Sequence, residues 1–211
     1  MRILAMETTA AIASAALYAD GEVVCVRRAD SSRKHAETLL PMIDDILREH
    51  DLTAADMDYF AVDIGPGSFT GVRIGVTVAN ALAYAANKSV IAVNALQTLS
   101  EPFFAAGRSV LAMIDARNGN AYAAAYCGTQ ELLAPCAEKI GDILAKAPAD
   151  AVAVGDVCCA EFAAEEPYRL PDAKWLAHAA ARLTSTATEA AVPVYLRPSQ
   201  AERMRKETGK C

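Results

Sequence analysis

The sequence predicts an α/β fold made of two related halves, and three observations support this. Apolar runs of strand length alternate with helical patterns along the 211 residues. The run Ile-Leu-Ala-Met-Glu-Thr-Thr at 3–9 has a counterpart at 110–116, Val-Leu-Ala-Met-Ile-Asp-Ala. After each run the predicted elements continue in the order βββαβα, at a period of about 107 residues. Chance similarity between alanine-rich segments is the alternative.

The first half is predicted in full. Its second and third strands alternate apolar and polar residues around the turn Asp20-Gly21, which is typical of a hairpin. Its long helices have apolar residues at helical spacing. A further strand ends at Asn94, which we expect to cap the next helix. The elements are strands at 3–9, 12–18 and 22–28, a helix at 34–49, a strand at 59–64, a helix at 72–86, a strand at 90–93 and a helix from 95.

The second half repeats this order but lacks a clear fifth strand, so we expect a truncated copy. We place the boundary near Gly107, with residues 1–107 as the N-terminal lobe and 108–211 as a smaller, degenerate C-terminal lobe. The elements are strands at 110–115, 120–126 and 131–135, a helix at 138–146, a strand at 151–154 followed by a helix, a helix at 172–182, an extended segment at 193–197 and a polar tail at 199–211.

The composition excludes several classes of protein. The net charge of −6 argues against a chain that grips nucleic acid by itself. No run reaches the roughly 18 apolar residues that a membrane span needs. The six cysteines include no CxxC pair and have no histidine spaced for zinc. We therefore expect a cytoplasmic protein with no membrane contact and reduced cysteines.

The segment Gly65-Pro66-Gly67-Ser68 lies between a buried strand and a helix. Such a turn directs backbone N–H groups and the positive end of the helix dipole to one point, which favours an anion. The candidate phosphate-binding residues are Gly65, Gly67 and Ser68, with Thr8 and Thr9 at the end of the first strand. A P-loop motif is absent, and no acid follows at the spacing of a Rossmann site.

The corresponding turns of the second half argue against catalysis. The turn at 115–118, Asp-Ala-Arg-Asn, has no hydroxyl groups, and Gly155-Asp156 lacks a second glycine. Half of a phosphate clamp would therefore be missing, and we expect no catalytic residues.

We also expect no metal site. His35 has Leu39, not histidine, four residues later. His50 follows the same helix and suits a partner of the helix dipole, and His178 suits a helix surface.

Small residues recur every fourth position on the helix at 72–86 and just before it. They are Gly71, Gly75, Ala79 and Ala83. Such a stripe permits close approach of another helix. The partner is either a helix of the same chain or a second subunit, and the sequence leaves both open.

Four segments together resemble the TsaB (YeaZ) family from end to end. They are Ile3–Thr9, Lys34–Ile43, Gly65–Gly75 and Pro193–Arg197, and the run Gly-Pro-Gly-Ser-Phe-Thr-Gly-Val-Arg is the most specific. The resemblance implies the duplicated actin-like, sugar-kinase superfamily fold (ASKHA, RNase H-like). Glu7 stands where many members have aspartate, which puts a phosphate or metal role for that acid in doubt.

The resemblance also implies a function. The family supplies a noncatalytic subunit for tRNA threonylcarbamoyladenosine synthesis, which pairs with a catalytic TsaD-like subunit and a TsaE-like ATPase. It contacts tRNA only indirectly and forms a homodimer when alone. No cofactor is implied beyond weak ATP or ADP at a subunit junction. The implied partner interface lies on the helices of the first lobe and comprises Leu39, Ile43, Gly71, Val72, Gly75, Val76, Ala79 and Ala83.

Two other functions are weighed against this one. An ATP-binding phosphotransferase or ATPase would use Glu7, Thr8, Gly65, Gly67 and Ser68. A peptidase is the third, because older descriptions call the family glycoprotease-like. The sequence does not support a peptidase, since it lacks the paired histidines of the larger homologue and has only His35.

Overall fold

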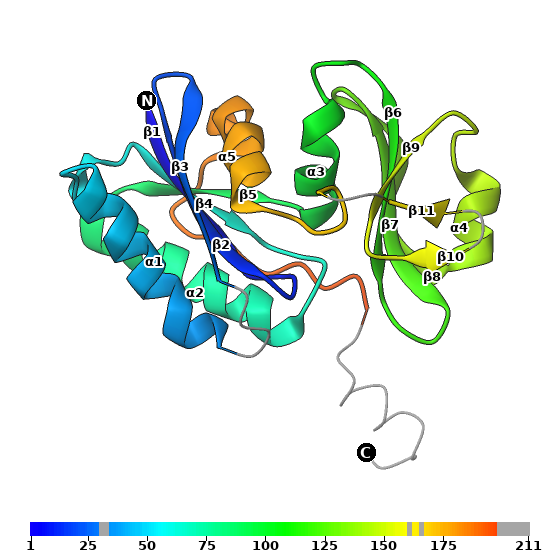
Figure 1. Ribbon diagram of the computed structural model, residues 1–211, viewed down its shortest axis with the longest axis horizontal. Helices are drawn as coiled ribbons and strands as arrows, with labels where there is room; N and C mark the ends of the chain where they lie inside the picture. The colour runs from blue at the N-terminus through cyan, green and yellow to red at the C-terminus, as the bar shows by residue number, and fades with distance from the viewer. Residues whose placement is uncertain (30–33, 160–161, 165–166, 198–211) are drawn as a thin grey trace, which may run out of the picture.

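The computed structural model describes residues 1–29, 34–159, 162–164 and 167–197. The chain forms two lobes side by side, each built on a mixed β-sheet (Figure 1). The polar tail expected at 199–211 lies outside the described residues. Among the described helices, none combines the length and apolar character needed to cross a bilayer.

The first sheet has the strand order β3-β2-β1-β4-β5. β1 pairs antiparallel with β2 and parallel with β4, so it lies in the centre. Helices α1 and α2 cover one face and α5 covers the other (Figure 1). The elements are β1 (Arg2–Glu7), β2 (Ala13–Ala19), β3 (Glu22–Ala29), α1 (His35–Glu49), β4 (Tyr59–Asp63), α2 (Phe69–Ala86), β5 (Ser89–Val93) and α5 (Ala173–Arg182), with 3-10 turns at Ala54–Asp56 and Thr184–Thr186.

The central position of β1 explains its uninterrupted apolar sequence. Leu4 and Met6 pack into the core beneath α1 and α2, whereas Ile3 and Ala5 pack into the core beneath α5. A strand with both faces covered cannot alternate apolar and polar residues. Because both of its faces are buried, β1 is a continuous apolar run, and such a run can be predicted as a strand from the sequence.

The second sheet has the order β8-β7-β6-β9, with α3 against one face and α4 against the other. α3 comes from the first half of the sequence, yet Leu96 and Leu99 pack against β6. The elements are α3 (Ala95–Ser100), a 3-10 turn at Glu101–Phe103, β6 (Ser109–Asp115), β7 (Asn120–Cys127), β8 (Gln130–Lys139), α4 (Ile140–Lys146), β9 (Val152–Gly155) and the short hairpin β10 (Cys158–Cys159) and β11 (Phe162–Ala163).

The two sheets confirm the duplicated α/β fold that the sequence predicts, with the second sheet one strand shorter. One predicted element is wrong. The helix expected after Gly155 is replaced by the β10-β11 hairpin, which packs beside β9. The strand predicted at 131–135 continues to Lys139, so α4 begins later than expected.

The lobes exchange helices, which differs from a simple division at Gly107. α3 belongs to residues 1–107 but covers the second sheet, and α5 belongs to residues 108–211 but covers the first. Each of these two helices buries its apolar face against the sheet of the other half of the chain, and that face would otherwise be exposed to water. A cut at Gly107 would therefore separate both helices from the sheets they cover.

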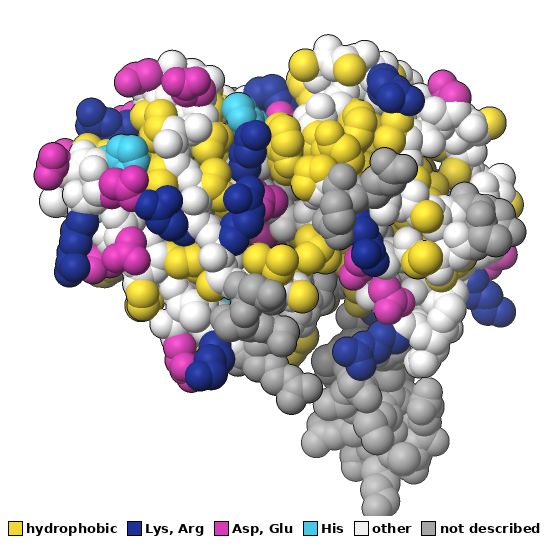
Figure 2. Space-filling view, in the orientation of Figure 1, with side chains coloured by type: hydrophobic (Ala, Val, Ile, Leu, Met, Phe, Trp, Pro, Cys, Tyr) yellow, Lys and Arg dark blue, Asp and Glu magenta, His cyan; other side chains and the backbone are white. Residues whose placement is uncertain are grey.

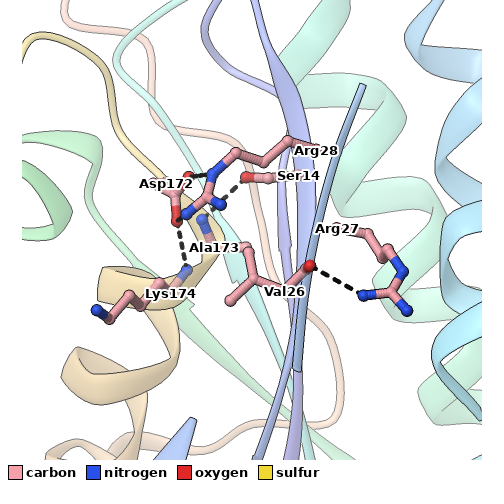
Figure 3. A network of polar contacts seen from close by, with 7 residues as sticks. All are labelled: Ser14, Val26, Arg27, Arg28, Asp172, Ala173 and Lys174. Carbon is pink, nitrogen blue, oxygen red and sulfur yellow. Dashed lines mark hydrogen bonds and ion pairs between the residues drawn. The ribbon is translucent and has the colours of Figure 1, made fainter. Parts of the chain in front are cut away.

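The start of α5 is fixed to the first sheet by polar contacts (Figure 3). Asp172 caps the helix by accepting the Lys174 N–H at 2.9 Å, and it binds the guanidinium of Arg28 on β3. The next N–H, of Ala173, donates to Ser14 Oγ on β2 at 2.9 Å. Free N–H groups of the first turn thus find partners on the sheet.

Candidate functional site

The Gly65–Ser68 turn connects β4 to α2 and lies against the end of β1. The Ser68 N–H donates to Thr9 O at 2.8 Å, and the Ser68 hydroxyl accepts the Gly71 N–H at 3.2 Å. A Cβ on Gly67 would lie 2.7 Å from Thr9 O, so only glycine permits this approach. The structure therefore brings the end of β1 and the turn together, as the sequence predicts.

The threonine groups that could bind phosphate are used inside the lobe. Thr8 is 1% exposed, and its hydroxyl donates to Gly71 O at 2.7 Å. The Thr9 N–H and hydroxyl both donate to Glu7 Oε1, at 2.5 and 2.7 Å. A hydroxyl that already donates to a buried acceptor is not free to donate to a phosphate without breaking that bond.

Glu7 and Asp63 form a buried carboxyl pair at the adjacent ends of the parallel strands β1 and β4. Burial raises the pKa of Glu7, and burial together with the charge of Glu7 raises the pKa of Asp63 well above its ordinary value. Glu7 Oε2 has no donor among the described residues unless Asp63 carries a proton. A proton on Asp63 would give Glu7 Oε2 its donor and relieve the repulsion between the two buried charges. Sequence reasoning singled out Glu7 but missed Asp63, whose only signal is its position at a strand end.

A cleft of about 700 Å³ separates the two lobes at this point. Thr9, Gly67 and Ser68 line it, whereas Thr8 and Gly65 do not. Of the candidate phosphate-binding residues, three therefore reach the cleft and two lie behind it.

The side of the cleft opposite the glycine turn carries charged groups of both signs. Asp115 and Asp156 both line it, and Asp156 Oδ1 accepts the Asp115 N–H at 2.7 Å. Arg117 and Arg197 also line the cleft and add two positive charges. Burial raises the pKa of Asp156. The two guanidinium groups thus balance the two carboxyl groups in formal charge.

The extended segment at 193–197 joins the two sides of the cleft. Val194 N–H donates to Ile64 O at 2.9 Å, and Arg197 donates to Ala116 O of the second lobe at 3.1 Å. Between them, the Tyr195 ring packs on Phe69 and its hydroxyl accepts from Arg73 Nε at 3.0 Å. The sequence pattern predicted an extended segment but gave no signal for this position.

The predicted interface residues are all buried within the chain. Gly75 lies against Thr8 and Val62 of the first sheet, and the others pack in the same core. This differs from the expectation that the small-residue stripe meets a second subunit, because the stripe faces the chain's own sheet. The residues are Leu39, Ile43, Gly71, Val72, Gly75, Val76, Ala79 and Ala83.

The opposite face of these helices is open. On α2, Arg73, Thr77 and Tyr84 are exposed, and Tyr84 is 90% exposed. Leu40 of α1 is 49% exposed. Figure 2 shows that charged side chains of both signs lie among hydrophobic ones over the first lobe. Any partner of α1 and α2 would contact this exposed face. The small-residue stripe is not part of it, because the stripe faces the sheet.

Comparisons with known proteins agree with this architecture. A family model described as TsaD: tRNA N6-adenosine threonylcarbamoyltransferase matches residues 26–201. The chain is 40% identical over 133 residues to the tRNA threonylcarbamoyladenosine biosynthesis protein TsaB of Escherichia coli, a match covering 60% of this chain and 55% of that protein. It is 34% identical over 130 residues to the Bacillus subtilis TsaB, with the same coverage. The chain thus spans about half the length of these curated relatives.

The similarity to a solved structure extends over both lobes. The structure of YeaZ from Pseudomonas aeruginosa superposes with a TM-score of 0.74 at 28% identity, and the match covers 92% of this chain and 99% of that one. The family model begins within β3 and covers β4, β5 and the whole of the second sheet, but not β1 and β2. The chain therefore belongs to the TsaD family and, within it, to the TsaB (YeaZ) group.

Proposed function

We propose that this chain is a noncatalytic subunit needed for tRNA threonylcarbamoyladenosine synthesis in the cytoplasm. The name of its curated relatives supplies the pathway. The observation that carries the noncatalytic role is the burial of Glu7, which is 0% exposed and paired with Asp63. An acid that holds a metal–nucleotide complex must reach the cleft, and this one does not.

The hydroxyl groups at the end of β1 support the same proposal. The Thr8 and Thr9 hydroxyls donate inside the first lobe. Binding a nucleotide through them would cost these buried hydrogen bonds. These features suit a chain that presents a surface to a partner protein better than one that binds a nucleotide substrate.

The surface it would present is the open face of α1 and α2, around Leu40 and Tyr84. A catalytic TsaD-like subunit is the proposed partner there, with a TsaE-like ATPase joining the pair and tRNA held by the others. In the absence of that subunit, a second copy of this chain would cover the same face. Leu40 and Tyr84 are among the large exposed apolar side chains of this face, and their burial against a partner would favour association.

The test is reconstitution with a purified TsaD-like subunit and a TsaE-like ATPase. We expect the chain to co-purify with the TsaD-like subunit, and the modified adenosine, measured by mass spectrometry of digested tRNA, to form only when the chain is present. Unchanged modification without the chain would contradict the proposal.

One observation favours a second function, an ATP-binding phosphotransferase or ATPase. Ser68 and Gly67 line the cleft at the start of α2, where the helix dipole favours an anion. Calorimetry of the isolated chain with ATP and Mg²⁺ separates the two functions. The noncatalytic proposal expects no measurable heat, and micromolar binding would favour the enzyme.

A further inference from the structure

Three side chains of metal-binding type meet at the outer edge of the first lobe. Cys25 lies on the edge strand β3, Glu49 is the last residue of α1, and His50 follows it. One ligand atom from each lies within 4.8 Å of the other two. This end of α1 points away from the second lobe (Figure 1). We propose that Cys25, Glu49 and His50 form a binding site for a divalent cation of the zinc class.

The donor set fits zinc in kind and number. Thiolate, imidazole and carboxylate are the three ligand types that zinc takes in proteins, and three protein ligands leave a fourth position for water. In a tetrahedral site the ligand atoms stand about 3.5 Å apart, given the usual bond lengths. Atoms already within 4.8 Å reach that spacing through side-chain rotation. The carbonyl end of α1 adds a negative potential that favours a cation.

A ring nitrogen of His50, unpaired among the described residues, is the strongest support for a cation at this site. Its Nε2 atom is buried and has no hydrogen-bond partner within the described part of the chain. A buried ring nitrogen without a partner is uncommon and costly. Coordination of a cation would satisfy it. The backbone N–H of His50 is used to close α1, so the ring is held at this place.

Arg27 occupies the site in the absence of metal. Its guanidinium donates to Cys25 Sγ at 3.2 Å and forms an ion pair with Glu49. Both side chains of that ion pair are more than a third exposed, so the pair is weak and Arg27 can turn into solvent. Cation binding displaces the thiol proton of Cys25 to water as the sulfur–metal bond forms.

The spacing of these residues in the sequence does not predict this site. Cys25 and His50 lie on different elements, and the single cysteine and single histidine match none of the usual zinc patterns. The absence of a metal site, which the sequence predicts, rests on spacing alone. Strand β3 and helix α1 must pack together before the three ligands meet.

The test uses the full-length chain, freed of metal with a chelator and then titrated with Co²⁺ and, in competition with a chromophoric chelator, with Zn²⁺. We expect one Co²⁺ per chain, with the near-ultraviolet charge-transfer band of a thiolate ligand. Cys25→Ser should remove the band, and His50→Gln should weaken Zn²⁺ binding at least about tenfold. Circular dichroism confirms that each variant is folded.

Two further variants sharpen the test. Arg27→Gln removes the competing cation and should tighten Zn²⁺ binding about three- to tenfold. Cys136→Ser is the matched control, because this half-buried thiol also has an acid and a base nearby, Glu138 and Lys146, but no histidine. It should leave the band and the affinity unchanged. Absence of the band in the unmodified chain, its survival in Cys25→Ser, or weaker binding in Arg27→Gln would each overturn the proposal.

Discussion

Asp172, the cap of α5, holds Arg28 of the edge strand β3 across 144 positions of the chain (Figure 3). The Arg28 Nη2 atom lies 3.0 Å from Asp172 Oδ1, which also accepts the Lys174 N–H at 2.9 Å. One carboxylate therefore starts a helix and attaches it to the sheet. This contact helps return the C-terminal half of the chain to the first lobe.

The capping role of Asp172 should outweigh its ion pair. We expect Asp172→Ala to lower the free energy of unfolding by about 1–2 kcal/mol, because the Lys174 N–H loses its acceptor and the Arg28 pair is lost with it. Arg28→Ala should cost less than about 1 kcal/mol, since half of that side chain is exposed. Urea denaturation of both variants measures the difference. Equal losses would show that the ion pair, not the cap, dominates.

The contact between α2 and β1 predicts unequal effects of two glycine substitutions. A Cβ on Gly75 would lie 2.5 Å from the Thr8 Oγ1 atom, whereas a Cβ on Gly71 would lie 1.9 Å from the Thr8 carbonyl oxygen. A side chain can turn aside, but the Thr8 carbonyl belongs to the backbone directly after β1. Gly75→Ala should cost about 1–3 kcal/mol, and Gly71→Ala should cost more.

A double mutant separates the two cases. Thr8→Ala removes the atom that Ala would meet at position 75, so we expect the cost of Gly75→Ala to shrink by about 1 kcal/mol in that background. The cost of Gly71→Ala should stay the same, because its clash is with backbone. Thermal or urea unfolding of the three single and two double variants, beside the unmodified chain, completes both cycles. Equal rescue at both positions would contradict the geometry.

The open face of α1 and α2 predicts which surface changes affect association. Leu40→Glu and Tyr84→Glu should leave the free energy of unfolding within about 0.5 kcal/mol, because both side chains are exposed. They should nevertheless weaken self-association or binding of a TsaD-like subunit about tenfold or more, through loss of apolar contact and burial of charge.

Leu132→Glu is the matched control for these substitutions. Leu132 lies on β8 of the second lobe and is 39% exposed, close to the 49% of Leu40. It should leave association unchanged. Light scattering and analytical ultracentrifugation of the three variants give the result, and an equal loss in Leu132→Glu would move the interface to another face.

The periodicity of the sequence predicted most of the helices and strands, because burial patterns and helix caps depend on residues close together in the sequence. β1 reads as apolar throughout because it is covered twice, and Asn94 and Asp172 cap their helices with side-chain oxygens. Which surface each helix covers was not predictable in the same way. The small residues of α2 showed that something approaches closely, but a sheet of the same chain and a second subunit demand the same residues there.

The site was predictable only in part for a similar reason. The turn at 65–68 and the hydroxyls at the end of β1 are neighbours in any fold of this order, so sequence placed them together. Asp63 joined them only when β1 and β4 paired in parallel register. The helix expected after Gly155 failed because one glycine after a strand permits a hairpin as readily as a helix.

The carboxyl pair of Glu7 and Asp63 predicts a specific pH dependence of stability. In the unfolded chain both groups ionise near their ordinary pKa values of 4.5 and 3.8, whereas burial raises both values in the folded chain and the charge of Glu7 further raises that of Asp63. Above about pH 5 the folded pair retains a proton that the unfolded chain has lost. The contribution of the pair is therefore greatest in acid, and it is lost as pH rises towards the raised pKa of the folded state.

Asp63→Asn should remove the part of this dependence that comes from Asp63, while Glu7 remains buried. The asparagine amide can donate to Glu7 as the protonated acid does, and its oxygen can still accept the Gly65 N–H, which lies 2.9 Å from Asp63 Oδ1. Above about pH 5, until the pH reaches the raised pKa of the folded pair, the unmodified chain should lose up to about 1.4 kcal/mol per pH unit relative to the variant, the slope for one proton. Urea unfolding at several pH values gives this difference, and Asp58→Asn, at an exposed acid, should give none. A flat difference for Asp63→Asn would mean that both carboxyl groups are ionised in the folded chain, because only a proton retained on folding makes its stability fall as the pH rises.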